Sequence, residues 1–109
     1  MVQIPTEELH LLHTNICQAV GDVKRLEILY VLHQQPMHVT ALAEVLDTPQ
    51  STISRHLGML RQRGLVVGER DGTAVVYRVT VPRLIEVMDM MRQVLRDVMA
   101  QQSGMLEKR

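Results

Sequence analysis

Aromatic residues and cysteine are scarce in this chain of 109 residues. Phenylalanine and tryptophan are absent, tyrosine occurs twice and cysteine once. The core must therefore be built from Leu, Val, Ile and the eight methionines, and methionine packs adaptably rather than fixing one shape. The single cysteine, Cys17, excludes a disulfide within one chain and is compatible with a reducing compartment. We therefore expect a cytoplasmic protein.

Long apolar runs and catalytic motifs are also missing. No stretch of eighteen apolar residues occurs, and no basic region followed by an apolar core stands at the N-terminus, so neither a membrane span nor a secretory signal is predicted. A Gly-rich phosphate loop and a clustered acid–base pair are absent, which argues against an enzyme. The length fits a single domain over residues 1–109, with frayed tails expected at 1–5 and 101–109.

The chain has no net charge, because twelve basic residues balance twelve acidic ones. The balance nevertheless differs along the sequence. Residues 1–49 hold two basic and six acidic side chains, residues 50–79 five and two, and residues 80–109 five and four. A local basic patch matters more for attraction to nucleic acid than the total charge does. Residues 50–79 are therefore the segment expected to approach a polyanion.

A helix is predicted over Thr48 to Gly64. Thr48 is a good N-cap, Pro49 suits the first helical position, and Gly64 supplies a left-handed residue at the end. Leu65 would add the hydrophobic contact that often accompanies such an end. The buried face is predicted to consist of Ile53, Leu57 and Leu60.

The opposite face of this helix carries small hydrogen-bonding side chains and one guanidinium, namely Gln50, Ser51, Thr52, Ser54, Arg55 and His56. Such groups suit base edges and phosphates. A second helical pattern, Val39 to Leu46, stands just upstream, and so short a connection is typical of a helix-turn-helix, whose second helix enters the major groove. The plainer alternative is an ordinary core helix with a polar face.

Two more helices are expected before this pair. The first begins at Pro5 and Thr6, ends at Gly21, and carries its apolar face on Leu9, Leu12, Ile16, Ala19 and Val20. Asp22 caps the second, which runs from Val23 to about Gln34 and is closed by Pro36. Its apolar positions are Val23, Leu26, Ile28, Leu29 and Leu32.

After Leu65 the pattern becomes extended. The runs 66–70 and 73–79 are rich in β-branched residues and are separated by Asp71-Gly72, a strong signal for a β-hairpin. A hairpin directly after a DNA-reading helix is a wing, and wings usually lie along the DNA backbone or minor groove. Arg70 and Arg78 are therefore predicted to hold phosphates, although each alone would also fit a solvated surface position.

The last predicted helix follows Pro82. Its apolar positions are Leu84, Ile85, Val87, Met88, Met91, Val94, Leu95, Val98 and Met99. This surface is wider than one small domain needs on a terminal helix. We expect it to pair, alongside the first helix, with a second subunit; the alternative is that it only covers its own core.

Taken together, these residues resemble the ArsR/SmtB family of winged-helix repressors. The similarity covers nearly all of residues 18–95 and includes Ala19 to Leu29, similar to the family's "AL-DPTRL-IL", and Gln50 to Leu57, similar to "SQ--VS-HL". The segment Leu42 to Leu46, Gly64-Leu65-Val66 and the wing end Val76-Tyr77-Arg78 complete it. The resemblance implies a mainly α-helical winged helix-turn-helix with a β-hairpin, dimeric through its first and last helices. It also implies repression at an inverted-repeat operator in double-stranded DNA until an effector releases the protein.

The family's known effector sites are not reproduced. Where metal sensors of the family carry a Cys-x-Cys, this chain has His38 and Thr40, and threonine is a poor ligand for a soft metal. The positions that match a second metal site, on the last helix, hold Val81, Arg83, Val94 and Asp97. Tyr30 stands where the redox sensors of the family have their first cysteine.

One cluster remains as a candidate effector site. His10, His13 and Cys17 lie at i, i+3 and i+7, along one edge of the first predicted helix. Imidazole and thiolate at this spacing could ligate zinc or a similar ion with help from solvent or a second subunit. A neighbouring histidine could instead make the Cys17 thiol oxidisable, or Cys17 could be a small half-buried core residue.

The sequence therefore predicts that Gln50, Ser51, Ser54, Arg55 and His56 read the major groove, while Thr52, Arg70 and Arg78 hold phosphates. A rival interpretation keeps the winged-helix fold but makes it an adapter that binds another protein through the same helix. The basic residues on that helix argue against the rival, and steep salt dependence of DNA binding would separate the two.

Overall fold

The computed structural model describes residues 3–107. The first helix, used below for residues 6–20 as a whole, consists of α1 (Thr6–Leu12), the π-helical turn η1 (His13–Cys17) and α2 (Gln18–Val20). Its start after Pro5 and its end before Gly21 confirm the predicted bounds. The π-helical turn was not predicted, because no local residue pattern specifies it. Asn15 accompanies this turn, donating from Nδ2 to the carbonyl of Leu11 at 2.9 Å.

The second helix, α3 (Val23–Gln34), begins as predicted. The Asp22 side chain caps it by accepting a hydrogen bond from the backbone N–H of Arg25 at 3.1 Å. Strand β1 (Met37–His38) follows, and then α4 (Val39–Val45) and α5 (Gln50–Gln62) form the predicted helix-turn-helix. The tight connection between them places Asp47 at a φ of +46°.

The start of α5 differs from the prediction. Pro49, not Thr48, is the N-cap, and no side chain caps the helix. The Thr48 hydroxyl instead donates to the carbonyl of Leu46 at 2.8 Å, and its backbone N–H donates to Ala43. Thr48 therefore completes the end of α4 rather than the beginning of α5. The far end of α5 is as predicted: Gly64 has a φ of +77°, and the N–H of Leu65 reaches the carbonyl of Leu60 at 2.9 Å.

The wing consists of β2 (Val66–Asp71) and β3 (Ala74–Val79), which pair antiparallel from Val66↔Val79 to Asp71↔Ala74. The two residues of its turn are therefore Gly72 and Thr73, one position later than the predicted Asp71-Gly72. Strand β1, which was not predicted, adds to the other edge of β3 and gives the order β1-β3-β2. Two residues carry too little pattern to predict a strand; β3 supplies the edge that orders them.

The core lies where α3, α4 and α5 meet the base of the hairpin and the start of α6 (Arg83–Glu107). Its fully or nearly fully buried side chains are Ala19, Ile28, Leu29, Leu32, Leu42, Ile53, Leu57, Leu60, Leu65, Val66, Val79, Leu84, Ile85 and Met88. Val23, predicted to belong to the apolar face of its helix, is exposed. Leu9 and Leu12 are also exposed, on the helix that was expected to pair with a second subunit. The predicted core is thus confirmed in its centre and wrong at Val23.

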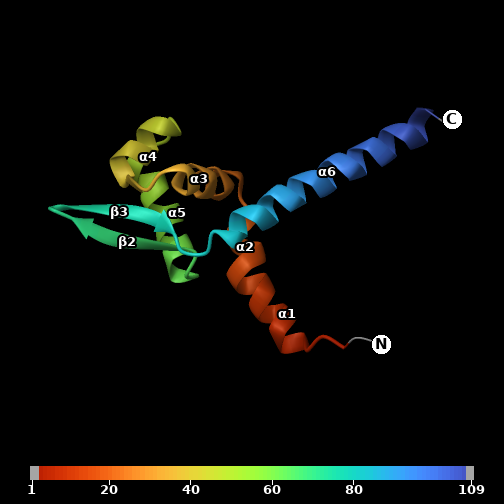
Figure 1. The fold of residues 1–109 in the computed structure, drawn as a ribbon, viewed down its shortest axis with the longest axis horizontal. Helices are drawn as coiled ribbons and strands as arrows, with labels where there is room; N and C mark the ends of the chain where they lie inside the picture. The colour runs from red at the N-terminus through yellow and green to blue at the C-terminus, as the bar shows by residue number, and fades with distance from the viewer. Residues whose placement is uncertain (1–2, 108–109) are drawn as a thin grey trace.

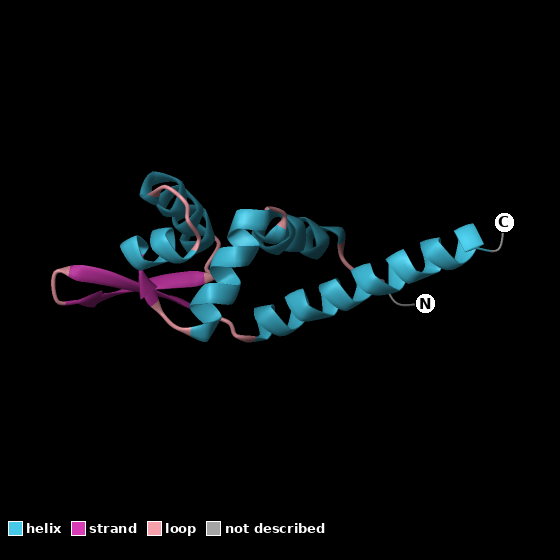
Figure 2. Cartoon of the chain, turned by 90° about the horizontal axis from the view of Figure 1, so that it is seen from above, coloured by secondary structure: helices cyan, strands magenta, loops and turns pink. Residues whose placement is uncertain are grey.

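Helix α6 is longer than predicted. Residues 101–107, expected to belong to a frayed tail, continue the helix to Glu107, while residues 1–2 and 108–109 lie outside the described part of the chain. The first helix and α6 both project from the body, in different directions (Figure 1), and the side view shows α6 leaving the end opposite the hairpin (Figure 2). Between residues 3 and 107, none of the helices combines the length and apolar character that crossing a bilayer requires.

Candidate nucleic-acid interface

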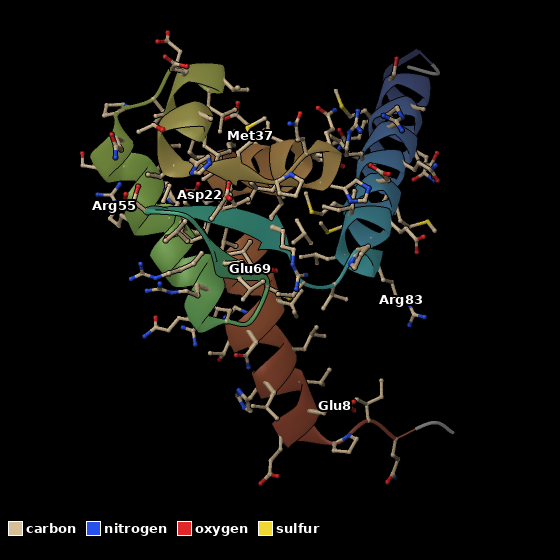
Figure 3. All side chains as sticks on the ribbon, turned by 60° about the vertical axis from the view of Figure 1, so that its left-hand side comes forward. Glu8, Asp22, Met37, Arg55, Glu69 and Arg83 are labelled. Carbon is tan, nitrogen blue, oxygen red and sulfur yellow. The ribbon has the colours of Figure 1, made fainter. Side chains whose placement is uncertain are left out.

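The outer face of α5 carries most of the predicted DNA contacts. Gln50, Ser51, Ser54 and Arg55 are exposed, and Thr52 is half-buried. Arg55 stands at the outer side of α5 (Figure 3). Ile53, Leu57 and Leu60, on the opposite side of the helix, are buried in the core. This packing holds the polar face in place from behind, so the structure brings these five side chains together as the sequence predicted.

The N-terminus of α5 is open. Because no side chain caps it, its first backbone N–H groups keep their hydrogen-bonding capacity and their partial positive charge for an outside acceptor. A helix N-terminus of this kind is a ready site for a phosphate oxygen. The displacement of Thr48 from the cap position therefore leaves α5 better suited to a DNA backbone than the predicted cap would have.

His56 does not belong to this exposed face. Its side chain is buried, with 8% exposure, and its Nδ1 lies 3.3 Å from Nη1 of Arg25. Burial lowers the pKa of His56, and this outweighs the nearby Asp22 carboxylate, which raises it. The prediction that His56 reads a base placed the residue on the wrong face. The signal was available, because His56 lies three residues after Ile53 and four before Leu60, which is the spacing of the buried side.

The guanidinium of Arg25, for which no local sequence pattern predicts a role, contacts three groups at once. Its Nε donates to the carbonyl of Ala19 at 2.7 Å and its Nη2 donates to the carbonyl of Gln18 at 2.9 Å, in addition to the contact with His56. Only the three-dimensional fold brings these groups together, because Arg25 and His56 are 31 positions apart in the sequence.

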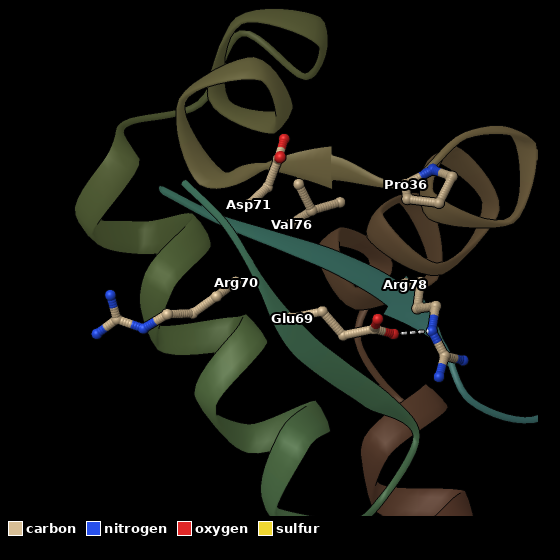
Figure 4. A pocket seen from close by; sticks show the side chains of 6 residues that line it. All are labelled: Pro36, Glu69, Arg70, Asp71, Val76 and Arg78. Atoms are coloured by element: carbon tan, nitrogen blue, oxygen red, sulfur yellow. Dashed lines mark hydrogen bonds and ion pairs between the residues drawn. The ribbon is translucent and has the colours of Figure 1, made fainter. Parts of the chain in front are cut away.

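The two wing arginines lie on opposite faces of the hairpin. Successive side chains of a strand alternate between faces, so Arg70 shares a face with Val66 and Gly68, while Glu69 points the other way. The register pairs Val67 with Arg78, which puts Arg78 on the face of Glu69. Figure 4 shows Arg70 extending to the side of α5 and Arg78 hydrogen-bonded to Glu69 on the far side.

Consequently, Arg70 extends from the wing toward the side on which α5 lies, whereas Arg78 extends from the other face of the wing (Figure 4). No described carboxylate lies within ion-pair distance of Arg55 or Arg70, whereas Glu69 neutralises Arg78. A shallow cavity of about 270 Å³ lies on the wing, and its charged lining residues are Glu69, Arg70, Asp71 and Arg78. Two acidic groups there balance the two arginines.

Comparison with known proteins decides the family. The protein-family model described as "Bacterial regulatory protein, arsR family" matches residues 22–67. The chain is 37% identical over 73 residues to the uncharacterized HTH-type transcriptional regulator MJ1325 of Methanocaldococcus jannaschii, covering 66% of this chain and 82% of that protein. It is 40% identical over 72 residues to the transcriptional regulator NmtR of Mycobacterium tuberculosis, covering 66% of this chain and 60% of NmtR.

This chain belongs to the ArsR/SmtB family. Solved structures agree with that assignment. The crystal structure of Mycobacterium tuberculosis Rv0081 matches with a TM-score of 0.75 and 27% identity, covering 92% of this chain and 98% of that one. The solution structure of the homodimeric winged helix-turn-helix DNA-binding domain of Mycobacterium bovis Mb0332 matches with a TM-score of 0.74 and 25% identity. The match covers 93% of this chain and 95% of that one. The resemblance noted in the sequence is confirmed, and with it the winged helix-turn-helix fold. The family consists of transcriptional regulators and not of enzymes.

In the part of the chain that the structure describes, no group of three or more His, Cys, Asp or Glu side chains is placed to hold a metal ion. His10, His13 and Cys17 are all exposed on the first helix, and the π-helical turn His13–Cys17 alters the α-helical spacing from which their common edge was predicted. Cys17 is exposed, so the interpretation of Cys17 as a half-buried core residue is wrong.

Proposed function

We propose that this ArsR/SmtB protein is a homodimeric, cytoplasmic repressor that binds an inverted-repeat operator through α5 and is released by an effector. The observation that supports this most is the outer face of α5, where exposed polar side chains surround an uncapped helix N-terminus. The buried residues of α5 hold that face rigidly, and Arg70 adds an unpaired positive charge beside it.

Within this proposal the residues divide into two roles. Gln50, Ser51, Ser54 and Arg55 read base edges in the major groove, since their side chains are exposed at the helix end that enters it. Thr52 and Arg70 hold phosphates of the DNA backbone. Arg78 would join them only after release from Glu69, and His56 supports α5 from within the protein rather than touching DNA.

The proposed dimer follows from the two projecting helices. Two copies of α5 related by a twofold axis would present themselves to two half-sites one helical turn apart, which is why an inverted repeat is the expected operator. One copy of α5 alone would contact too few base pairs for a specific site. The exposed apolar residues of the first helix and α6 are the surface on which such a dimer would form.

DNA binding is tested by fluorescence anisotropy with a duplex taken from upstream of the protein's own gene. Arg55→Ala is expected to weaken binding to this duplex by about 1–3 kcal/mol and to weaken binding to a scrambled duplex much less, as the loss of a base contact does. Arg96→Ala, which removes an exposed arginine of α6, is the matched control and should bind as the unmodified protein does.

Two results would contradict this proposal. Equal weakening by Arg55→Ala on both duplexes would make Arg55 a phosphate contact. Absence of a steep fall in affinity with added salt would instead favour the protein-interaction adapter, because neutralised phosphates release counterions and make true DNA binding salt-dependent.

An ion such as zinc is the first effector class to test. Its ligands would be His10, His13 and Cys17, completed by the partner subunit, since one protomer does not assemble them into a site. Zinc is titrated against a chelator at constant salt under reducing conditions. A loss of DNA affinity of about tenfold, the size of a typical allosteric coupling, that Cys17→Ser abolishes would place the effector there. Indifference to zinc would exclude that ion.

A further inference from the structure

Arg25 lies at the point where the first helix, α3 and α5 meet. The first helix has one buried side chain, Ala19 in α2, while Ile16 and Val20 pack partly buried against the core. The polar contacts of Arg25 add to these apolar contacts at the end of the helix.

The guanidinium acts as a cap for the first helix. The last carbonyls of a helix have no partner within it, and a cation near them is favourable because the C-terminal end of a helix carries partial negative charge. Arg25 donates to the carbonyl of Ala19 at 2.7 Å and to that of Gln18 at 2.9 Å, which also accepts from the backbone N–H of Gly21 at 3.4 Å. The planar fork of arginine satisfies both at once, which the single ammonium group of lysine cannot do in the same way.

The third contact of Arg25 fixes the state of His56. An arginine nitrogen is always a donor, so the Nδ1 of His56, 3.3 Å away, must be the acceptor. His56 is then neutral, with its proton on Nε2. The His56 side chain belongs to α5 and is buried. This contact therefore joins the end of the first helix to the buried side of α5, opposite the DNA-reading face.

We propose that Arg25 is a positioning residue: through His56 it couples the position of the first helix to the position of α5, and it thereby sets DNA affinity. The first helix exposes large apolar residues, including Leu11 with 64% exposure, so its position depends on whatever covers it. A shift of its C-terminal carbonyls pulls on the guanidinium and changes how His56 holds α5. This inference rests on the proposed operator binding for its functional consequence, but the contact itself is a property of the free protein.

The contact is tested first in the unmodified protein by ¹⁵N NMR of the His56 ring at pH 7.5. A neutral ring with an unprotonated Nδ1 is expected. The opposite tautomer, or a ring that exchanges freely between both, would overturn the proposal, and this measurement does not depend on any variant folding.

Coupling to α5 is tested by amide hydrogen exchange in Arg25→Lys, which keeps the charge but loses the fork. Amides of α5 are expected to exchange about tenfold faster, while those of the β2–β3 hairpin keep their rates, because local opening changes the protection of one unit at a time. Uniform acceleration throughout the domain would make Arg25 a general stabilising residue and contradict the proposal. Arg96→Lys on α6 is the control and should leave α5 unchanged.

The functional consequence is tested by a double-mutant cycle on DNA affinity with Arg25→Met and His56→Gln. Each single variant is expected to weaken binding about tenfold and the double variant no more than either, because residues that act through one another are not additive. The proposal would be overturned if the double variant lost affinity by the product of the two single effects, about a hundredfold. It would also be overturned if Arg25→Met bound DNA as the unmodified protein does. If the unmodified protein binds no operator, the proposed function fails, while ring NMR and hydrogen exchange still decide whether Arg25 positions α5.

Discussion

At the scale of single residues, His56 shows how one position can belong to two patterns. Its neighbours Ser54 and Arg55 face outward, and the family resemblance places it within the DNA-reading segment. Its spacing from Ile53 and Leu60 nevertheless turns it inward, where it meets Arg25. The spacing could therefore have predicted the buried face, whereas the contact with Arg25 could not be predicted, since Arg25 is 31 positions away in the sequence.

Buried and neutral, His56 should make folding stability depend on pH. Burial lowers its pKa in the folded protein below the ordinary 6.5, so the unfolded chain binds the proton more readily. The contribution of His56 is therefore complete above about pH 6.5 and is lost as the pH falls through the lower folded pKa. The charged groups that act on His56 are Asp22, Arg25 and Lys24 from the start of α3 and Arg55 from α5.

Urea unfolding between pH 5 and 8 measures this dependence. The free energy of unfolding of the unmodified protein is expected to fall on acidification below pH 6.5, and His56→Gln should remove that part of the fall. His33→Gln, which changes an exposed histidine, serves as the control and should retain the original profile. An unchanged profile in His56→Gln would show that His56 is not the titrating group.

At the scale of secondary-structure elements, the sequence predicts what is specified locally. The caps and ends of α3 and α5 are set by Asp22 and Gly64, and the hairpin by its β-branched runs, so these elements could be predicted. The π-helical turn at His13–Cys17 and the strand Met37–His38 could not, because tertiary contacts create them. Thr48 is an intermediate case. Its hydroxyl could cap α5, but it donates a hydrogen bond to the Leu46 carbonyl at the end of α4 instead.

The wing contains a position where only glycine fits. A Cβ added to Gly68 would lie 2.8 Å from Cγ1 of Val75 and 3.1 Å from Cε1 of Tyr77 across the hairpin, which is closer than such atoms pack. Gly68→Ala is therefore expected to lower the free energy of unfolding by about 1–3 kcal/mol, the usual cost of overpacking, as measured by urea denaturation.

Gly58, within α5, offers the matched control. A Cβ there would meet nothing within 4 Å, and alanine favours a helix over glycine by about 1 kcal/mol. Gly58→Ala should therefore raise the free energy of unfolding by a similar amount. A neutral or stabilising effect of Gly68→Ala would show that the Val75 and Tyr77 side chains move aside without cost.

At the scale of the whole molecule, the shape is too extended for a self-sufficient domain. The radius of gyration is 17.1 Å, whereas a compact chain of this length would have about 13 Å. The excess comes from the first helix and from α6, in which every residue from Asp89 to Ser103 is exposed. Large apolar side chains lie along both, including Leu11, Leu12, Met91, Val94, Leu95 and Met99. An apolar surface of this extent, running over two projecting helices, favours burial against a second copy.

Sedimentation equilibrium tests this arrangement directly. The unmodified protein is expected at about twice the 12.4 kDa mass of one chain. Leu95→Glu, which places a charge at a residue with 57% exposure in one protomer, should weaken dimerisation by at least about tenfold, since an unpaired carboxylate buried in an interface is costly.

Val45→Glu is the matched control, because Val45 is equally exposed but lies on α4. It should sediment as the unmodified protein does. If Leu95→Glu remained dimeric, α6 would not form the interface. If the variant became monomeric and lost operator binding together with the dimer, the two α5 helices would be shown to act as a pair. The exposed apolar surface of α6 would then be the reason that a chain with so small a core presents two reading helices at a fixed separation.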